Sequence, residues 1–348
     1  MNQLDNILTQ VESLDKNALE LVAHKLYQLL KGSDDSCNHN DPVHKCRKCG
    51  SEHIMKYGKD STGKQRYRCK SCGATFFETS GSVVSGSHCS DDKWEKYIEL
   101  LINGASLCRC AEECHISVQT AFLWRHKILH ALQADQNNRV LAGIIEVDDT
   151  YISISYKGNH SKSKKFTMPR APYKRGSDNR SATGSKACVM CAVERNGQLY
   201  SEVMGKGQLT TKRVEYAFKD RIMPESIVLA DNSWSIGKFF KANDTIGLVQ
   251  LKSTVNPKNK RGGTPEIIGT YHIQTVNNLH KRLRIFLQRY NGVSTKYLNH
   301  YINLFVWIDN HKKLADTLGN EMKSYIAGEN TYIRNKDIIA MPVIPQAA

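Results

Sequence analysis

The stretch Glu146-Val147-Asp148-Asp149-Thr150-Tyr151 lies inside a run of β-branched and aromatic residues spanning 143–155. Such a run predicts a strand, and successive side chains of a strand point to opposite faces. If Val147 and Tyr151 face a core, Glu146 and Asp148 share the other face. The run therefore predicts one strand of a sheet and places acidic side chains together on one side of it.

The residues that follow predict the rest of a sheet and its covering helices. We expect strands at 187–194, 199–204 and 226–230, and helices at 210–221, 276–290 and 297–312. Strands interspersed with helices in this order predict a mixed α/β domain, which we place at 140–315.

A second acid, Asp231, ends the apolar run 227–230. A charge at the end of a buried strand must be paired or desolvated, so it is poorly placed for a purely stabilising role. Two acids on neighbouring strands would form an oxygen-rich site for Mg²⁺, and two such ions about 3.5–4 Å apart support phosphodiester chemistry. Each aspartate taken alone could equally be a turn former or a helix cap.

The composition points to a polyanionic partner. Among 348 residues, 49 Lys and Arg against 34 Asp and Glu give a formal net charge of +15, which favours nucleic acid or an anionic surface. A hydrophobic content of 40% excludes a wholly disordered chain. No apolar stretch reaches the roughly 20 residues of a membrane span, and the N-terminus lacks a secretory pattern. We expect a cytoplasmic, nucleoid-associated protein that does not bind a membrane.

Two cysteine pairs, each with two intervening residues, predict a structural zinc site. Four thiolates at this spacing can bind one Zn²⁺ tetrahedrally, and a reducing compartment disfavours disulfides. We place a zinc ribbon at 41–82, where basic residues outnumber acidic ones. The four predicted ligands are Cys46, Cys49, Cys69 and Cys72.

Residues 88–135 predict a helix-turn-helix. Two helical patterns, 105–114 and 118–131, are joined by a short turn, and Ser117 is a natural N-cap of the second. In such a motif the start of the second helix meets the major groove. The DNA-binding candidates are Gln119, Thr120 and Arg125. The alternative is a helical bundle that only packs between domains.

Two further basic features are candidates for DNA contact. The stretch 156–186 is rich in Lys, Arg, Gly and Pro, and its DNA-binding candidates are Lys157, Lys164, Lys165 and Arg175. A solubilising insert is the alternative. On the helix predicted at 276–290, one face carries Asn277, His280, Lys281 and Arg284. A solvated basic face is the alternative there.

Several ordered motifs resemble the ISXO-type transposases of bacterial insertion sequences, which have an N-terminal zinc ribbon. The resemblance covers about 42–312. The motifs are Glu146-Val147-Asp148-Asp149-Thr150-Tyr151, Tyr156-Lys157-Gly158-Asn159-His160, Leu229-Ala230-Asp231, Tyr271-His272-Ile273-Gln274-Thr275-Val276-Asn277 and Asn291-Gly292-Val293-Ser294-Thr295-Lys296-Tyr297-Leu298.

The resemblance implies an RNase H-like catalytic domain that uses Mg²⁺ or Mn²⁺, with two ions in the site. Asp148 and Asp231 would be its first and second acids, and Asn277 occupies the third position, where many relatives have Glu. An amide oxygen binds Mg²⁺ but adds no charge, for which Glu146 or Asp149 could compensate. Arg284 stands where a Lys is usual, and the two differ in geometry.

We therefore expect a DDE-type transposase that binds double-stranded DNA at terminal inverted repeats, cleaves it and joins it to a target. Synapsis implies a homodimer or larger assembly, with the helices expected in 1–40 as a candidate contact. Residues 316–348 are expected to be a C-terminal tail. The alternatives are a DNA-binding regulator without catalysis, and a decayed or nuclease-only copy.

Overall fold

A computed structural model describes residues 45–61, 63–158, 186–254, 264–265, 267–312, 317–328 and 331–345. The helices predicted within 1–40 lie outside these residues. The chain divides into two compact units. We call 136–310 with 341–345 the sheet unit, and 45–135 with 311–340 the helical unit.

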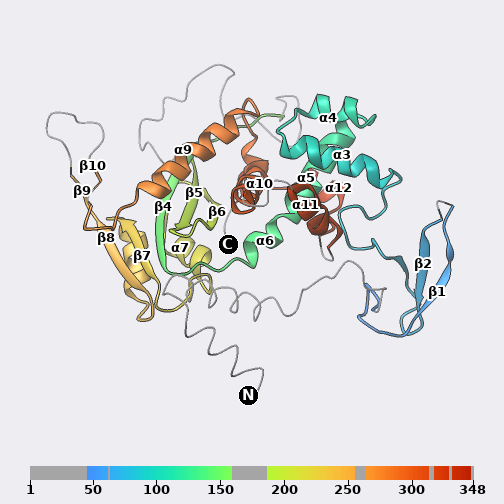
Figure 1. Ribbon diagram of the computed structural model, residues 1–348, viewed down its shortest axis with the longest axis horizontal. Coiled ribbons are helices and arrows are strands. Elements are labelled where there is room, and N and C mark those ends of the chain that lie inside the picture. The colour runs from blue at the N-terminus through green and yellow to red at the C-terminus, as the bar shows by residue number, and fades with distance from the viewer. Residues whose placement is uncertain are drawn as a thin grey trace. The chain divides into compact units, whose positions relative to one another are not determined.

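A five-stranded mixed sheet forms the centre of the sheet unit (Figure 1). Three strands run antiparallel in sequence order, and the last two are parallel to the first, giving the order β6-β5-β4-β7-β8. This is the strand order of RNase H-like folds, so the predicted fold class is confirmed. The strands are β4 (Ile144–Ser153), β5 (Lys186–Glu194), β6 (Leu199–Lys206), β7 (Ile227–Asp231) and β8 (Gly247–Leu251).

One face of this sheet packs on an apolar core. Ile145 and Val147 of β4 lie there with buried residues of β5 and β7, as the alternation of 143–155 predicts. Two helices cover this face, α7 (Thr211–Phe218) and α8 (Trp234–Lys241), through Val214, Phe218 and Phe240 among others. Neither α8 nor β8 was predicted from the sequence.

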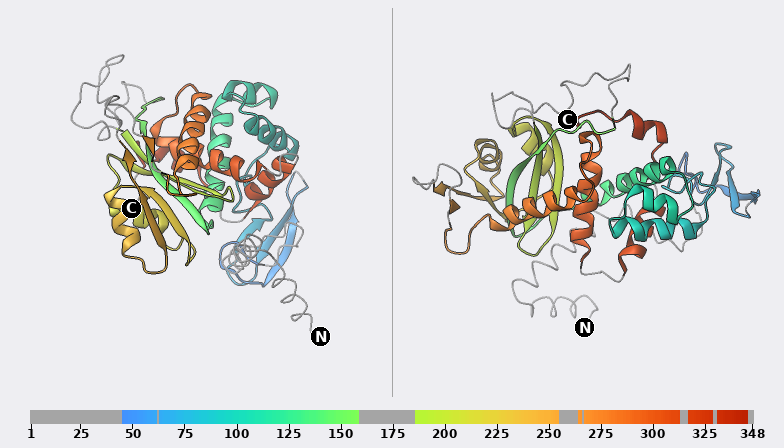
Figure 2. Two further views of the ribbon diagram at one scale, coloured as in Figure 1. Left: turned by 60° about the vertical axis from the view of Figure 1, so that its left-hand side comes forward. Right: turned by 90° about the horizontal axis from the view of Figure 1, so that it is seen from above.

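The opposite face meets two longer helices, which follow the short pair β9 (Ser253–Thr254) and β10 (Thr264–Pro265). Helix α9 (Gln274–Gln288) packs against β4 and β5, and α10 (Leu298–Asn310), which follows the turn η1 (Thr295–Tyr297), packs against β6. Figure 2 shows α9 running beside the sheet, as in Figure 1. The acidic face of β4 is therefore the face that α9 covers.

The helical unit combines a small antiparallel sheet with a helix bundle. The sheet contains β1 (Ile54–Lys59), β2 (Gln65–Cys69) and β3 (Thr75–Phe77). In the bundle, Trp94 and Trp124 stack with ring centroids 3.7 Å apart, and the Tyr97 hydroxyl donates to the carbonyl of Ala121. The bundle comprises α3 (Asp91–Ile102), α4 (Leu107–Glu113) and α5 (Val118–Ala131), followed by the short α6 (Gln133–Asn137).

The stretch expected to be a C-terminal tail contains two more helices, α11 (Leu318–Ala327) and α12 (Asn335–Ala340). Helix α11 packs against α3 and α5 and buries Met322 and Ile326. The pattern was missed because the apolar residues are few and the helices short. None of the helices within the described residues has the length and apolar content to cross a membrane.

Candidate functional site

The acidic face of β4 carries Glu146, Asp148 and Thr150, which alternate with core residues. Strand β4 pairs with β7 in parallel, with Val147 opposite Ala230. Asp148 and Asp231 are the next residue in each strand, and the charge of Asp231 adds to the raised pKa of Asp148, so the two acids lie close together where β7 ends. The structure thus brings the first two predicted site residues together.

The environment of these two aspartates disfavours their charge. Burial raises the pKa of Asp148 to about 8, and the negative charges of Asp231 and Asp149 add to the rise. Burial also raises the pKa of Asp231, although the backbone N–H of Ser233 donates to its Oδ1 at 3.0 Å. Two partly buried acids that repel one another require either a proton or a cation.

Successive polar residues on the acidic face of β4 contact successive turns of helix α9. Glu146 accepts hydrogen bonds at the first turn of α9, the Nδ1 of His280 lies 3.8 Å from Oδ2 of Asp148, and Arg284 donates to Oγ1 of Thr150 at 2.5 Å. Two residues of a strand advance about 6.8 Å and four of a helix about 6 Å, so the two repeats stay in step. Each polar residue of β4 therefore has its own partner on α9.

Glu146 is the anchor of this packing, a role that the sequence analysis missed. Its side chain is fully buried and accepts from the backbone N–H groups of Thr275 (2.8 Å) and Val276 (3.0 Å) and from the Thr275 hydroxyl (2.8 Å). Arg195 Nε lies 2.9 Å and His272 Nδ1 3.4 Å from the same carboxylate. With its oxygens used in this way, Glu146 does not supply the charge missing at Asn277.

Asp149 does not supply that charge from this face either. It points to the other face of β4 and hydrogen-bonds Tyr151, whose hydroxyl accepts from the backbone N–H of Leu209. Burial raises the pKa of Asp149. The partner of Asp149 is thus a core tyrosine.

The predicted polar face of α9 contains both buried and exposed side chains. His280 is 6% exposed, and burial together with the charge of Arg284 lowers its pKa to about 4. We therefore do not retain His280 as a DNA contact, because its ring is buried and lies against Asp148. Asn277 and Lys281 are exposed, and the Asn277 amide makes no hydrogen bond within the described residues.

Lys157 also has a structural partner. Its ammonium group donates to the carbonyls of Tyr290 (3.0 Å), Asn291 (3.3 Å) and Gly292 (2.8 Å), just beyond the end of α9. A cation there stabilises the helix dipole, so we do not retain Lys157 as a DNA contact. Lys164, Lys165 and Arg175 lie outside the described residues.

In the helical unit, the four predicted cysteines form a zinc-binding cluster. Their sulfur atoms all lie within 4.8 Å of one another, and the Sγ–Sγ distances are 3.6 Å for Cys46–Cys72 and 3.7 Å for Cys49–Cys69. A Zn–S bond of about 2.3 Å separates two sulfurs of a tetrahedron by roughly 3.8 Å, so the donor set fits Zn²⁺. A hydrogen bond from the backbone of Cys72 lowers the pKa of Cys69 to about 6, which favours the thiolate that a metal needs.

Helices α4 and α5 are separated by a short turn and pack against each other. Ser117 caps α5 by accepting from the backbone N–H of Thr120 at 3.0 Å. Gln119 is exposed and Thr120 half-buried, so both remain candidates for a groove contact. We do not retain Arg125 as a DNA contact, because its guanidinium is buried and donates to the carbonyl of Ala105 at 2.7 Å.

Comparisons with known proteins relate the sheet unit to a transposase family. Residues 140–310 match the family model of the ISXO2-like transposase domain. The chain is 24% identical over 262 residues to an uncharacterized protein in transposable element ISH50 of Halobacterium salinarum, covering 75% of this chain and 83% of that protein.

Solved structures of Mos1 resemble the chain only distantly. For the Mos1 strand transfer complex the identity is 12%, the coverage 70% of this chain and 79% of that one, and the TM-score 0.21. For the Mos1 mariner paired end complex with Mn the identity is 13%, the coverage 69% of this chain and 80% of that one, and the TM-score 0.22. Our fold assignment rests on the strand order of the sheet.

We predict one zinc ion per chain, held by the four cysteines. Replacement of Cys69 by Ser should abolish zinc retention and unfold the ribbon, because the ribbon's own apolar core is small. Elemental analysis of the purified protein measures the zinc. Cys108→Ser, at an exposed cysteine, is the control and should keep the metal. Equal zinc in both variants would contradict the assignment.

We also predict that Glu146→Gln loosens α9. An amide keeps one acceptor but loses the charged hydrogen bonds, so the free energy of unfolding should fall by about 2–3 kcal/mol. Urea denaturation measures this fall, and hydrogen exchange at Thr275 and Val276 should accelerate. Glu215→Gln, at an exposed glutamate of α7, is the matched control. Unchanged exchange at the start of α9 would refute the anchoring role.

Proposed function

We propose that the chain, whose residues 140–310 match the family model of the ISXO2-like transposase domain, is a DDE-type transposase with Asn in the third position. The resemblance to insertion-sequence transposases predicted from the sequence is thereby confirmed. The proposal concerns the chemistry: metal-dependent cleavage of DNA at the element's ends and transfer of those ends to a target. The observation that supports it is the proximity of Asp148 on β4 to Asp231, the last residue of the neighbouring strand β7, whose negative charge adds to the raised pKa of Asp148.

The donor set at this pair fits a hard divalent cation. Asp148 and Asp231 would supply carboxylate oxygens, and Asn277 of α9 would supply a neutral amide oxygen; these are the ligand types that Mg²⁺ and Mn²⁺ prefer. Burial raises the pKa of both acids, and the neighbouring acids add to the rise at Asp148, so a bound cation would favour their ionised forms. When bound, one or two such cations would acidify a water molecule and neutralise charge on the reacting phosphate.

The chain's own residues position the reactants. His280 packs against Asp148 and limits the rotation of its carboxylate. Lys281, exposed one turn after Asn277, can attract the phosphate backbone, and Arg284 fixes the same stretch of α9 to β4 through Thr150. Catalysis in this arrangement consists of orientation and charge stabilisation, without a covalent protein intermediate.

We propose two successive displacements at this site. In the first, a water oxygen attacks the phosphorus at the element's end, the bond to the 3′ oxygen breaks, and a free 3′-OH results. In the second, that 3′-OH attacks a phosphodiester of target DNA, whose own 3′ oxygen leaves. The number of phosphodiester bonds in the second step is unchanged, so no energy source is required.

The remaining parts would supply DNA recognition and assembly. We propose that the zinc ribbon of 41–82 and the helix-turn-helix of 88–135 bind the terminal inverted repeats, with Gln119 and Thr120 at the groove. Pairing of two ends requires a homodimer or larger assembly, for which residues 1–40 remain our candidate contact. A regulator without catalysis would need neither aspartate.

We predict that Asp148→Asn and Asp231→Asn each reduce strand joining by at least about a hundredfold, the scale expected when charge stabilisation is removed from a reacting phosphate. The assay joins a labelled duplex, carrying the repeats that flank the coding region, to a plasmid in Mg²⁺ or Mn²⁺. Asp149→Asn is the control on the same strand, because its side chain lies on the opposite face, and it should change the yield at most a few-fold.

A native chain that cleaves the labelled duplex but does not join it to the plasmid would favour a nuclease-only protein. Full activity of both Asp148→Asn and Asp231→Asn would contradict the proposed site.

The raised pKa of Asp148 also predicts a pH dependence of metal binding. A cation binds the ionised carboxylate, so below about pH 8 it must displace a proton. The affinity for Mn²⁺ should therefore increase as the pH rises, by roughly 25-fold between pH 6.5 and 8.5 for one displaced proton. Calorimetry in two buffers of different ionisation enthalpy measures both affinity and proton release, and Asp148→Asn should remove the dependence.

A further inference from the structure

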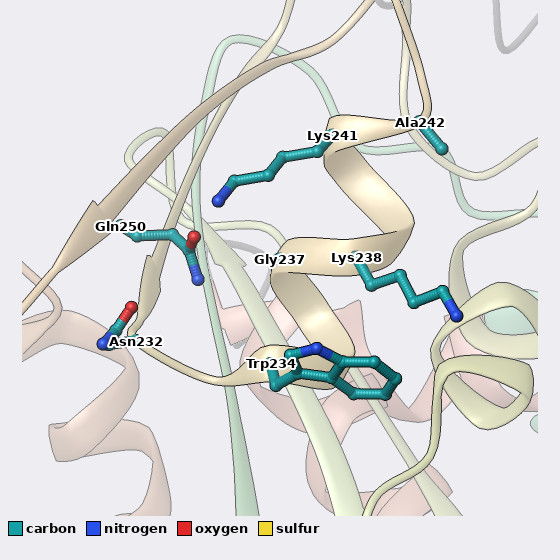
Figure 3. Close-up of a pocket in the computed structure, with 7 residues that line it drawn as sticks. All are labelled: Asn232, Trp234, Gly237, Lys238, Lys241, Ala242 and Gln250. Carbon is teal, nitrogen blue, oxygen red and sulfur yellow. The ribbon is translucent and has the colours of Figure 1, made fainter.

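A pocket of ≈ 670 Å³ lies beside the end of β7, within the roughly 300–1,000 Å³ range of ligand sites (Figure 3). Helix α8 forms one side of it and Gln250 of β8 another. The lining residues are Asn232, Trp234, Gly237, Lys238, Lys241, Ala242 and Gln250. We call it the Trp234 pocket.

Trp234 is unusually exposed for its type. Of the chain's four tryptophans, Trp94, Trp124 and Trp307 are at most 5% exposed, whereas Trp234 is 72% exposed. It begins α8 and contributes nothing to the core of the sheet unit. A large aromatic surface left in water at the mouth of a pocket is typical of a binding platform.

Cations and amides surround this aromatic surface. The Nζ of Lys238 lies 4.9 Å from the centroid of the Trp234 ring, and Lys241 lies one turn further along α8. Figure 3 shows the Lys241 side chain extending toward the Gln250 amide, with Asn232 on the same side, whereas Lys238 extends the other way, beside the Trp234 ring. An aromatic platform with adjacent lysines and amides matches a nucleotide, which carries a ring, a phosphate and hydrogen-bonding edges.

The pocket is tied to the second proposed acid. The Gln250 amide donates to the backbone carbonyls of Asp231 (3.4 Å) and Ser233 (3.2 Å). Gly237 permits this position, because a Cβ there would lie 2.7 Å from Gln250 Nε2. The Gln250 side chain thus connects the pocket wall to Asp231, the residue that would hold the cation.

We propose that the Trp234 pocket binds an unpaired nucleobase of the DNA strand, stacked on the indole ring, with the adjoining phosphates on Lys238 and Lys241. This proposal rests on the proposed function, which makes DNA the ligand. The base must be unpaired, because the faces of paired bases are covered by their neighbours in the duplex. Since Trp234 follows Asp231 by three residues, the base belongs to a nucleotide close to the scissile phosphate.

The test uses the full chain and three duplexes of one sequence: fully paired, with one additional unpaired adenine, and with an unpaired abasic nucleotide in its place. The abasic duplex has the same backbone and bend but lacks the base. Fluorescence anisotropy gives the dissociation constants. Stacking predicts that the adenine duplex binds about tenfold more tightly than the abasic one. Quenching of tryptophan emission should accompany it, since only Trp234 is exposed.

Three variants assign the effect to the ring. Trp234→Ala should remove the difference between the adenine and abasic duplexes, and Trp234→Phe should keep most of it, because a ring is retained. Tyr216→Ala removes another exposed aromatic of the sheet unit and should leave the difference unchanged. Circular dichroism verifies that the variants are folded.

Equal binding of the adenine and abasic duplexes by the native chain would overturn the inference, as would a Trp234→Ala variant that weakens all three duplexes alike. In both cases joining that depends on Asp148 would leave the proposed function intact. A native chain that binds none of the duplexes and joins no DNA would overturn both.

Discussion

The docking of α9 on the polar face of β4 through the Glu146 carboxylate is the constraint on which the candidate site depends. Glu146 binds two backbone N–H groups at the start of α9, and Lys157 binds three carbonyls beyond its end. Both charges have the sign that the helix dipole favours. Because both residues belong to β4 or the segment just after it, one stretch of chain holds both ends of the helix that carries Asn277.

This arrangement explains why the fold remains stable although Asp148 and Asp231 repel each other. Asp148 and Asp231 are close and partly buried, and both have raised pKa values, so they do not stabilise the fold as carboxylates. The apolar core on the other face of the sheet and the Glu146 anchor stabilise the same strand from two sides. The fold therefore does not depend on the charges of Asp148 and Asp231, and both carboxylates can bind a ligand.

The sequence predicted the parts of the molecule whose signals are local. Alternation in 143–155 identified the acidic face of β4, cysteine spacing identified the zinc-binding cluster, and Ser117 marked the start of α5. Strand order and register were not local signals; they entered through the resemblance. The edge strand β8 was missed because it is mostly half-buried, and its weak apolar pattern resembles that of a loop.

The sequence could not show which side chains have partners within the folded chain. Arg125, His280 and Lys157 are all basic residues in plausible DNA-binding segments, yet each binds groups from elsewhere in its own unit. The composition and helical spacing of a sequence cannot distinguish a basic side chain that binds carbonyls of its own chain from one that is available to bind a DNA phosphate. Glu146 was misjudged for the same reason, since its partners lie 129 and 130 residues away in sequence.

The step-by-step match between β4 and α9 also limits how this domain can vary. Deleting one residue from β4 reverses every side chain beyond it, whereas deleting one from α9 rotates the rest of the helix by about 100°, so neither change can correct the other. Insertions and deletions in homologous domains should consequently avoid both segments. A chimera that exchanges either segment alone would inherit mismatched partners, and the two must be exchanged as one piece.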